Sequence, residues 1–291
     1  MPTLIPVQYA KRKYPEGITP KLQEVAAHLD KVSIHPRMPY SLHTEYSFGK
    51  RRLNSEVVSS FPELVHCHKK GVPQLWKSKR WAEEFADFIR QLVGSNQSPG
   101  IIEIHPPFND YCGSIPEFLE VYRTFEARIT EHYPSASIVI ENRMGSRYSG
   151  GSFLISTAED LRILHEQVQE MGLQLQLVLD FPQLFTAHRL TTGKFSPGAI
   201  RKIMRSLCPL QESINGIHIW GKKDYGDGVK RAHMGDLDTY FEDQECKDVF
   251  LEEVKSLLKD DRPILFVPEV NSDDEDLRSI IEDLQKVAEF S

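Results

Sequence analysis

Polar residues that can bind a metal ion stand at or near the ends of four apolar runs in this sequence. They are Glu141 in ASIVIE, Asp180 in LQLQLVLD, His218 in NGIHIW and Glu269 in ILFVPE. A carboxylate is costly to bury unless it is paired or binds a cation. Three carboxylates brought together also repel one another unless a positive charge lies among them. The pattern therefore predicts one divalent metal ion bound by these four side chains.

The ligand types indicate which ions fit this predicted site. An oxygen-rich set with one imidazole is typical of Mn²⁺, Mg²⁺ or Co²⁺, and Zn²⁺ remains an alternative. Taken singly, each carboxylate could instead form a salt bridge or cap the following helix. Their recurrence in successive runs favours the metal site, with coordination positions left for a substrate.

The runs that carry these residues are short and continuously apolar, as is typical of parallel strands buried on both faces. We expect six clear strands and two weaker ones. The clear strands are 31–35, 100–105, 136–141, 173–180, 215–220 and 264–269, and the weaker ones are 4–8 and 72–76.

Helical patterns lie between these strands and begin at residues that commonly cap helices. The expected helices are 21–29 after Thr19-Pro20, 79–93 after Ser78, 115–132, 158–171 after Thr157, 197–207, 247–259 and 274–288. Alternating strands and helices predict a parallel α/β fold. The glycine-rich phosphate turns of open sheets, GxGxxG and GxxxxGK[ST], do not occur. We therefore predict a single (β/α)8 TIM-barrel domain over residues 1–291, with its active site at the carboxyl ends of the strands.

Composition and charge limit the classes of partner. The chain has 40% hydrophobic residues and a net charge of −7, which is ordinary for a globular protein and disfavours nucleic acid as the main partner. The cysteines are widely spaced, which favours reduced thiols. No run is apolar or long enough for a signal peptide or a membrane helix. We expect a cytoplasmic protein with a small-molecule substrate and no membrane partner; its oligomeric state stays open.

Basic residues gather in the segments that follow the predicted metal ligands. They are Arg143, His188, Lys222, Lys223 and Arg231. In a chain of net negative charge, this concentration predicts an anionic or sugar-like substrate with phosphate or carboxylate groups. The alternative is that these charges are simply solvated. The glycine-containing segment 144–152 is predicted to close over the substrate, with a surface turn as the alternative.

Several segments resemble the xylose-isomerase-like barrel superfamily, which contains sugar isomerases, ketose epimerases and endonuclease IV-like apurinic-site nucleases. These segments are IEIHPP, IVIENRMGS, LVLDFPQLFTAH, GIHIWGKK, RAHMGDLDTYF and FVPEV, within roughly residues 100–270. The order Glu, Asp, His, Glu on the last four strands is similar to the single-metal site of the epimerases. The resemblance implies that Glu141 and Glu269 exchange protons with the substrate.

The sequence departs from both branches of this superfamily at Gln183, where the resemblance implies a histidine. It also lacks the Asp-x-His of the nucleases at 229–231, ahead of Gly235. The resemblance implies that Asn142 and Gln183 contact the substrate.

His105 matches a nuclease metal ligand and is a candidate for a second metal ion or a substrate contact. Its partner from strand three would be absent if that strand ends at Trp76. If the strand is instead 64–68, the partner would be His66 or His68.

The leading hypothesis is a metal-dependent isomerase or epimerase acting on a small sugar or polyol, phosphorylated or not. In this hypothesis a metal-bound enediolate forms while Glu141 and Glu269 transfer protons. The alternative is a metal-dependent phosphodiester or phosphate-ester hydrolase of the endonuclease IV-like type. A further alternative is a barrel that binds a ligand or partner without catalysis.

Overall fold

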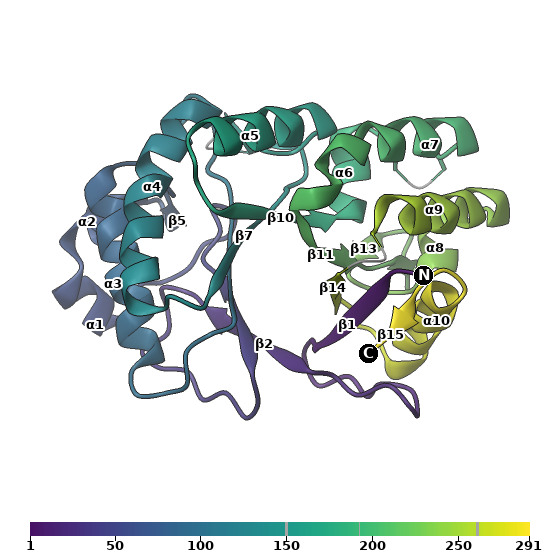
Figure 1. The fold of residues 1–291 in the computed structure, drawn as a ribbon, viewed down its shortest axis with the longest axis horizontal. Coiled ribbons are helices and arrows are strands. Elements are labelled where there is room, and N and C mark those ends of the chain that lie inside the picture. Colours follow the sequence, from purple (N-terminus) through teal and green to yellow (C-terminus); the bar gives the residue numbers. More distant parts are fainter. Residues whose placement is uncertain (149–150, 192, 260–261) are drawn as a thin grey trace. The chain divides into compact units, whose positions relative to one another are not determined.

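A computed structural model describes residues 1–291 apart from 149–150, 192 and 260–261. The chain divides into two compact units: one spans residues 24–176, and the other combines residues 1–23 with 177–291. Figure 1 labels many of the elements of both. We call them the central unit and the terminal unit and describe each by itself. The single-domain assignment stays a prediction.

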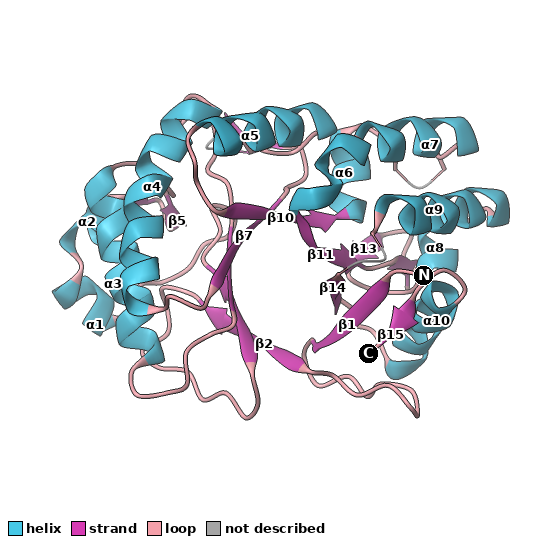
Figure 2. Ribbon diagram, viewed as in Figure 1, coloured by secondary structure: helices cyan, strands magenta, loops and turns pink. Residues whose placement is uncertain are grey.

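The central unit is built on parallel strands in the order β2 (Leu22–Ala27), β3 (Tyr40–Thr44), β6 (Ile101–Ile104) and β7 (Ser137–Glu141). Its longer helices are α3 (Lys79–Val93), α4 (Ile115–His132) and α5 (Ala158–Glu170), and its short elements are α1 (Ser55–Ser60), α2 (Pro62–His66), the hairpin β4–β5 (His68–Lys69, Val72–Pro73) and the hairpin β8–β9 (Arg147–Tyr148, Gly151–Ser152). The side chains of Ser78, Ser114 and Thr157 cap the three longer helices. Helices α3 and α4 run side by side (Figure 2).

The terminal unit has parallel strands in the order β10 (Leu175–Asp180), β11 (Ile214–Ile219), β14 (Pro263–Pro268) and β1 (Thr3–Gln8), with β15 (Glu289–Phe290) beside β1. Its helices are α6 (Phe181–Ala187), α7 (Pro197–Ser206), the 3₁₀ helix Cys208–Ser213, α8 (Leu237–Phe241), α9 (Gln244–Leu257) and α10 (Asp274–Gln285), and its hairpin is β12–β13 (Lys222–Asp224, Lys230–Ala232). Helices α7 and α9 lie side by side (Figure 2).

Parallel strands and helices alternate along the chain, which confirms the predicted (β/α)8 barrel class. The xylose-isomerase-like subtype stays a prediction. The five predicted strands between residues 100 and 269 correspond to β6, β7, β10, β11 and β14. Their apolar residues are buried, as continuous apolar runs require.

The N-terminal third corrects several predictions. Residues 31–35 form no strand, and residues 72–76 contribute only β5, which pairs with β4 in a short hairpin. The segment predicted as a helix at 21–29 instead contains β2. Its first two residues, Leu22 and Gln23, belong to the terminal unit and pair there with the end of β1. Strand pairing therefore overrides the helical pattern there. Strand three is β3, which the sequence analysis missed.

Two simpler expectations concern the cysteines and the membrane. Cys67, Cys112, Cys208 and Cys246 are all free thiols, as predicted. In the described part of the chain, no helix combines the length and the apolar character needed to cross a membrane.

Candidate metal site

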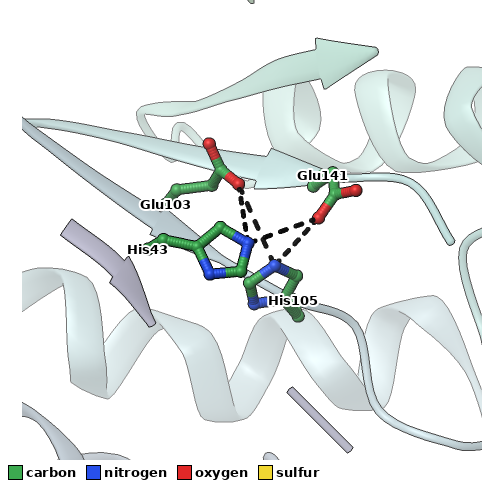
Figure 3. A group of neighbouring side chains, drawn as sticks. All are labelled: His43, Glu103, His105 and Glu141. Atoms are coloured by element: carbon green, nitrogen blue, oxygen red, sulfur yellow. Dashed lines mark ion pairs between the residues drawn. The ribbon is translucent and has the colours of Figure 1, made fainter. Parts of the chain in front are cut away.

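A group of histidine and glutamate side chains lies at the carboxyl ends of three neighbouring strands in the central unit (Figure 3). His43 on β3 and Glu103 on β6 are register partners, so their side chains start side by side. His105 follows β6 two residues after Glu103 and therefore lies on the same face of the strand. Glu141 is the last residue of β7, beside the end of β6. We call these four residues the His/Glu group.

The spacing of the donor atoms in the His/Glu group fits a metal ion. One nitrogen or oxygen from each side chain lies within 4.8 Å of all the others. The Nε2 of His43 is 3.6 Å from Glu103 Oε1 and 4.0 Å from Glu141 Oε2, and the Nε2 of His105 is 3.9 Å and 2.9 Å from the same two atoms. Ligands bonded at about 2.0 Å in a tetrahedron lie about 3.3 Å apart. Glu103, His105 and Glu141 are buried, and 13% of the His43 side chain is exposed.

Backbone contacts hold the two central members of the group in place. The Nδ1 of His105 lies 3.3 Å from the carbonyl oxygen of Glu45, and Trp76 Nε1 donates to the carbonyl oxygen of His105 at 2.7 Å. Thr44 Oγ1 donates to the carbonyl oxygen of Glu103 at 2.7 Å. Histidines that bind metals usually donate their second ring nitrogen to such a carbonyl. This arrangement leaves Nε2 of His105 directed at Glu141.

Two arginines carry positive charge close to the His/Glu group. Arg143 Nη1 donates to Glu141 Oε2 at 3.0 Å, and only 10% of the Arg143 side chain is exposed. Arg51 Nε donates to Glu45 Oε1 at 2.8 Å. Both guanidinium groups lie over the ring of Tyr46, at 4.8 Å for Arg51 and 5.4 Å for Arg143. They partly offset the charge of the buried carboxylates.

Burial shapes the protonation of residues around the group. Burial lowers the pKa of His28 to about 3, and the charges of Arg51 and His105 act in the same direction. His28 is therefore neutral at pH 7, with its ring 5.9 Å from that of His43. Burial raises the pKa of Glu45, against the opposing effect of Arg51.

Three of the four metal ligands predicted from sequence lie in the terminal unit. Asp180 and His218 are register partners on β10 and β11, and His218 Nδ1 is 3.5 Å from Glu269 Oε1. Trp220 Nε1 donates to Asp180 Oδ2 at 2.9 Å. The fourth predicted ligand, Glu141, belongs to the central unit. The four-residue site therefore stays a prediction, as do the proton-transfer roles of Glu141 and Glu269.

The sequence analysis missed His233, which also contacts Glu269. Its Nδ1 lies 3.2 Å from Glu269 Oε2, and its ring lies 4.4 Å from that of Trp220. Burial raises the pKa of Glu269, but His233 and His218 lower it more, so it lies well below its usual range. His233 ends no apolar run. The sequence signals at His233 were its place two residues before Gly235 and its place in RAHMGDLDTYF, one of the segments that resemble the superfamily.

Some of the predicted substrate-binding residues lie beside the predicted metal ligands. Gln183 donates from its backbone to Asp180 Oδ1 at 2.8 Å and from its side chain to Oδ2 at 2.6 Å, so Asp180 also caps α6. Lys222 Nζ lies 5.7 Å from the Trp220 ring and 5.8 Å from the Tyr240 ring. Burial lowers the pKa of Lys222, and the Asp180 carboxylate acts in the opposite direction.

The other predicted substrate-binding residues have different surroundings. Lys223 Nζ lies 3.3 Å from Asp276 and 3.9 Å from Asp273, and Arg231 pairs with Asp227. The Arg231–Asp227 pair is of the kind that exposed surface charges form, whereas the Asp276 partner of Lys223 is buried. Asn142 is buried directly after β7, and His188 follows the end of α6. Substrate binding by all of these residues stays a prediction.

The strand-three partner of His105 is His43, which corrects both alternatives drawn from the sequence. His66 ends helix α2 and His68 begins the hairpin strand β4, so neither lies on the strand next to β6. The error followed from misplacing strand three. A role for His105 in a second metal site stays a prediction.

Comparisons with known proteins give no family. No family model matches the chain, and no curated protein matches it. Similar solved structures include the crystal structure of AsfvAP:AG (13% identity, 86% of this chain, 84% of that chain, TM-score 0.47). Another is the GH53 catalytic domain of Ignisphaera aggregans (11% identity, 86% of this chain, 74% of that chain, TM-score 0.43). A third is a family 89 glycoside hydrolase from Clostridium perfringens in complex with PUGNAc (11% identity, 74% of this chain, 19% of that chain, TM-score 0.33). Because all three TM-scores lie below 0.5, these similarities assign neither a family nor an activity to the chain.

The fold and the side chains together define the class of molecule: a (β/α)8 barrel with a histidine and glutamate group that can hold a metal ion.

Proposed function

We propose that this chain is a metal-dependent hydrolase of phosphate esters or phosphodiesters. The observation that carries the proposal is the composition of the His/Glu group. His43, His105 and Glu141 supply two imidazoles and one carboxylate, a ligand set known from catalytic zinc sites that keep a fourth position open. When bound in such a set, a divalent cation polarises the phosphoryl oxygen and activates water.

Glu103 is suited to act as the general base. Its Oε1 lies 3.6 Å from His43 and 3.9 Å from His105, so a water held among these side chains is within reach of the carboxylate. Glu103 would accept a proton from the water as the water oxygen attacks phosphorus. The phosphorus–oxygen ester bond would then break, and the protonated Glu103 would return this proton to the leaving alcohol.

Arg143 supports an anionic substrate. Its buried guanidinium group already donates to Glu141, and guanidinium geometry matches phosphate oxygens well. Binding there would place a phosphate beside the His/Glu group. Arg143 is one of the basic residues that the sequence predicts to bind an anionic substrate, and in this proposal it binds the phosphate group.

The same group is why we favour hydrolysis over the isomerase hypothesis. The single-metal isomerase site would use Glu141, Asp180, His218 and Glu269, and it leaves His43 and His105 without a function. The hydrolase proposal gives both imidazoles and both carboxylates of the His/Glu group a place in one site.

Metal content tests the proposal. We expect His43→Ala and His105→Ala each to weaken binding of Zn²⁺ at this site by at least about tenfold, because each removes one ligand. Elemental analysis after dialysis against limiting Zn²⁺ would measure this, alongside hydrolysis of a panel of phosphate monoesters and diesters. His132→Ala, at the end of α4, is the matched control and should keep the wild-type metal content. Unchanged metal content in both ligand variants would rule out a metal at the His/Glu group.

A further inference from the structure

Two aromatic side chains of the central unit, one exposed and one partly buried, are in contact. The ring centroids of Phe48 and Tyr148 are 4.4 Å apart, with their planes at 47°. Phe48 is 39% exposed, and Tyr148 is partly buried. Single exposed apolar residues need no explanation, but two rings held in contact make a surface that can take a third ring. We call them the aromatic pair.

Tyr148, one member of the aromatic pair, packs on buried side chains. Beneath it lies a buried cluster of Val72, Phe108 and Phe153, against which Tyr148 packs. The hairpin β8–β9 that carries Tyr148 is tied down because the backbone N–H of Asn109 donates to Ser152 at 2.9 Å. Tyr148, held in this way, loses little conformational freedom when a ligand binds.

Each member of the pair is linked to the His/Glu group through intervening residues. On one side, Ser47 donates to the carbonyl oxygen of Pro106, next to His105, and Phe48 follows Ser47 directly. On the other side, Tyr148 lies 6.1 Å from Phe153, and the guanidinium group of Arg143 lies 5.5 Å from that same ring. Arg143 in turn donates to Glu141.

We propose that the aromatic pair binds an aromatic ring in the alcohol part of the substrate. A phosphate ester whose phosphoryl group lies at Arg143 would have its organic part next to Phe153, Tyr148 and Phe48. The anionic end and the aromatic end would then be bound by chemically matched surfaces. This inference rests on the proposed function and narrows it to aryl or nucleoside-type esters, for which the pair determines specificity.

Two non-hydrolysable probes test this inference by binding alone. Phenylphosphonate and methylphosphonate share the anionic group, and they differ in the ring. With the Zn²⁺-loaded protein, calorimetry should show phenylphosphonate binding more tightly. Phe48→Ala and Tyr148→Ala should each lower that preference by about 2- to 12-fold, the size of one aromatic contact, and leave methylphosphonate affinity unchanged.

Controls separate the failure of this inference from the failure of the proposed function. Tyr225→Ala removes a 54% exposed aromatic side chain of the terminal unit and should change neither affinity. Phe48→Tyr keeps the ring and should keep the preference. Equal binding of the two phosphonates, or a preference that survives both alanine substitutions, would overturn the aromatic subsite and leave the hydrolase proposal standing. Failure of both phosphonates to bind would count against the hydrolase itself.

Discussion

Glu103→Gln is expected to lower the hydrolytic rate constant kcat by about 10²- to 10⁴-fold, the usual contribution of a general base. The amide has nearly the same shape as the carboxylate, but it does not accept a proton from water. Because His43, His105 and Glu141 would still supply two imidazoles and a carboxylate, we expect the metal to stay bound. The rate should be measured on whichever phosphate ester the wild-type chain hydrolyses fastest.

The metal content of the same variant decides what Glu103 does. Loss of the metal together with activity would make Glu103 a ligand, whereas full activity would show that its carboxylate takes no part. Glu117→Gln is a matched control, since Glu117 lies in the first turn of α4 and is not a member of the His/Glu group. It should leave both the rate and the metal content unchanged.

The sequence predicted most where local signals were strong. Helix α3 begins after Ser78 and spans the predicted residues 79–93, because an N-cap serine and a regular apolar face both mark it. The strands that end at Glu141 and Asp180 were found because their apolar runs stop at a carboxylate. In each case the pattern is contained within a single segment of the chain.

It predicted least where a segment takes its conformation from a distant partner. Strand β3 reads YSLHT, too short and too polar to be recognised, and it is defined by pairing with β6. Because β3 was not predicted, His43 was not recognised as a candidate ligand beside His105. His233 was missed for a similar reason, because its contact with Glu269 joins segments more than thirty residues apart.

Trp76 of the central unit packs in the aromatic core and also contacts the backbone of His105. Its ring is 1% exposed and lies 5.2 Å from the rings of Trp81 and Phe118. Its indole N–H donates to the carbonyl oxygen of His105 at 2.7 Å. One side chain thus joins the aromatic core to a candidate metal ligand.

Trp76→Ala is expected to lower the free energy of unfolding by about 3–5 kcal/mol, because it removes a large buried side chain and leaves a cavity. Urea unfolding of the metal-free protein would measure the loss, without any contribution from bound metal. Trp76→Phe keeps a ring in place but leaves the His105 carbonyl without its donor, so a smaller loss of about 1–3 kcal/mol is expected. Phe48→Ala, at the surface, should change the stability by no more than about 0.5 kcal/mol. A loss below about 1 kcal/mol for Trp76→Ala would show that the aromatic packing around this residue contributes little to the stability of the chain.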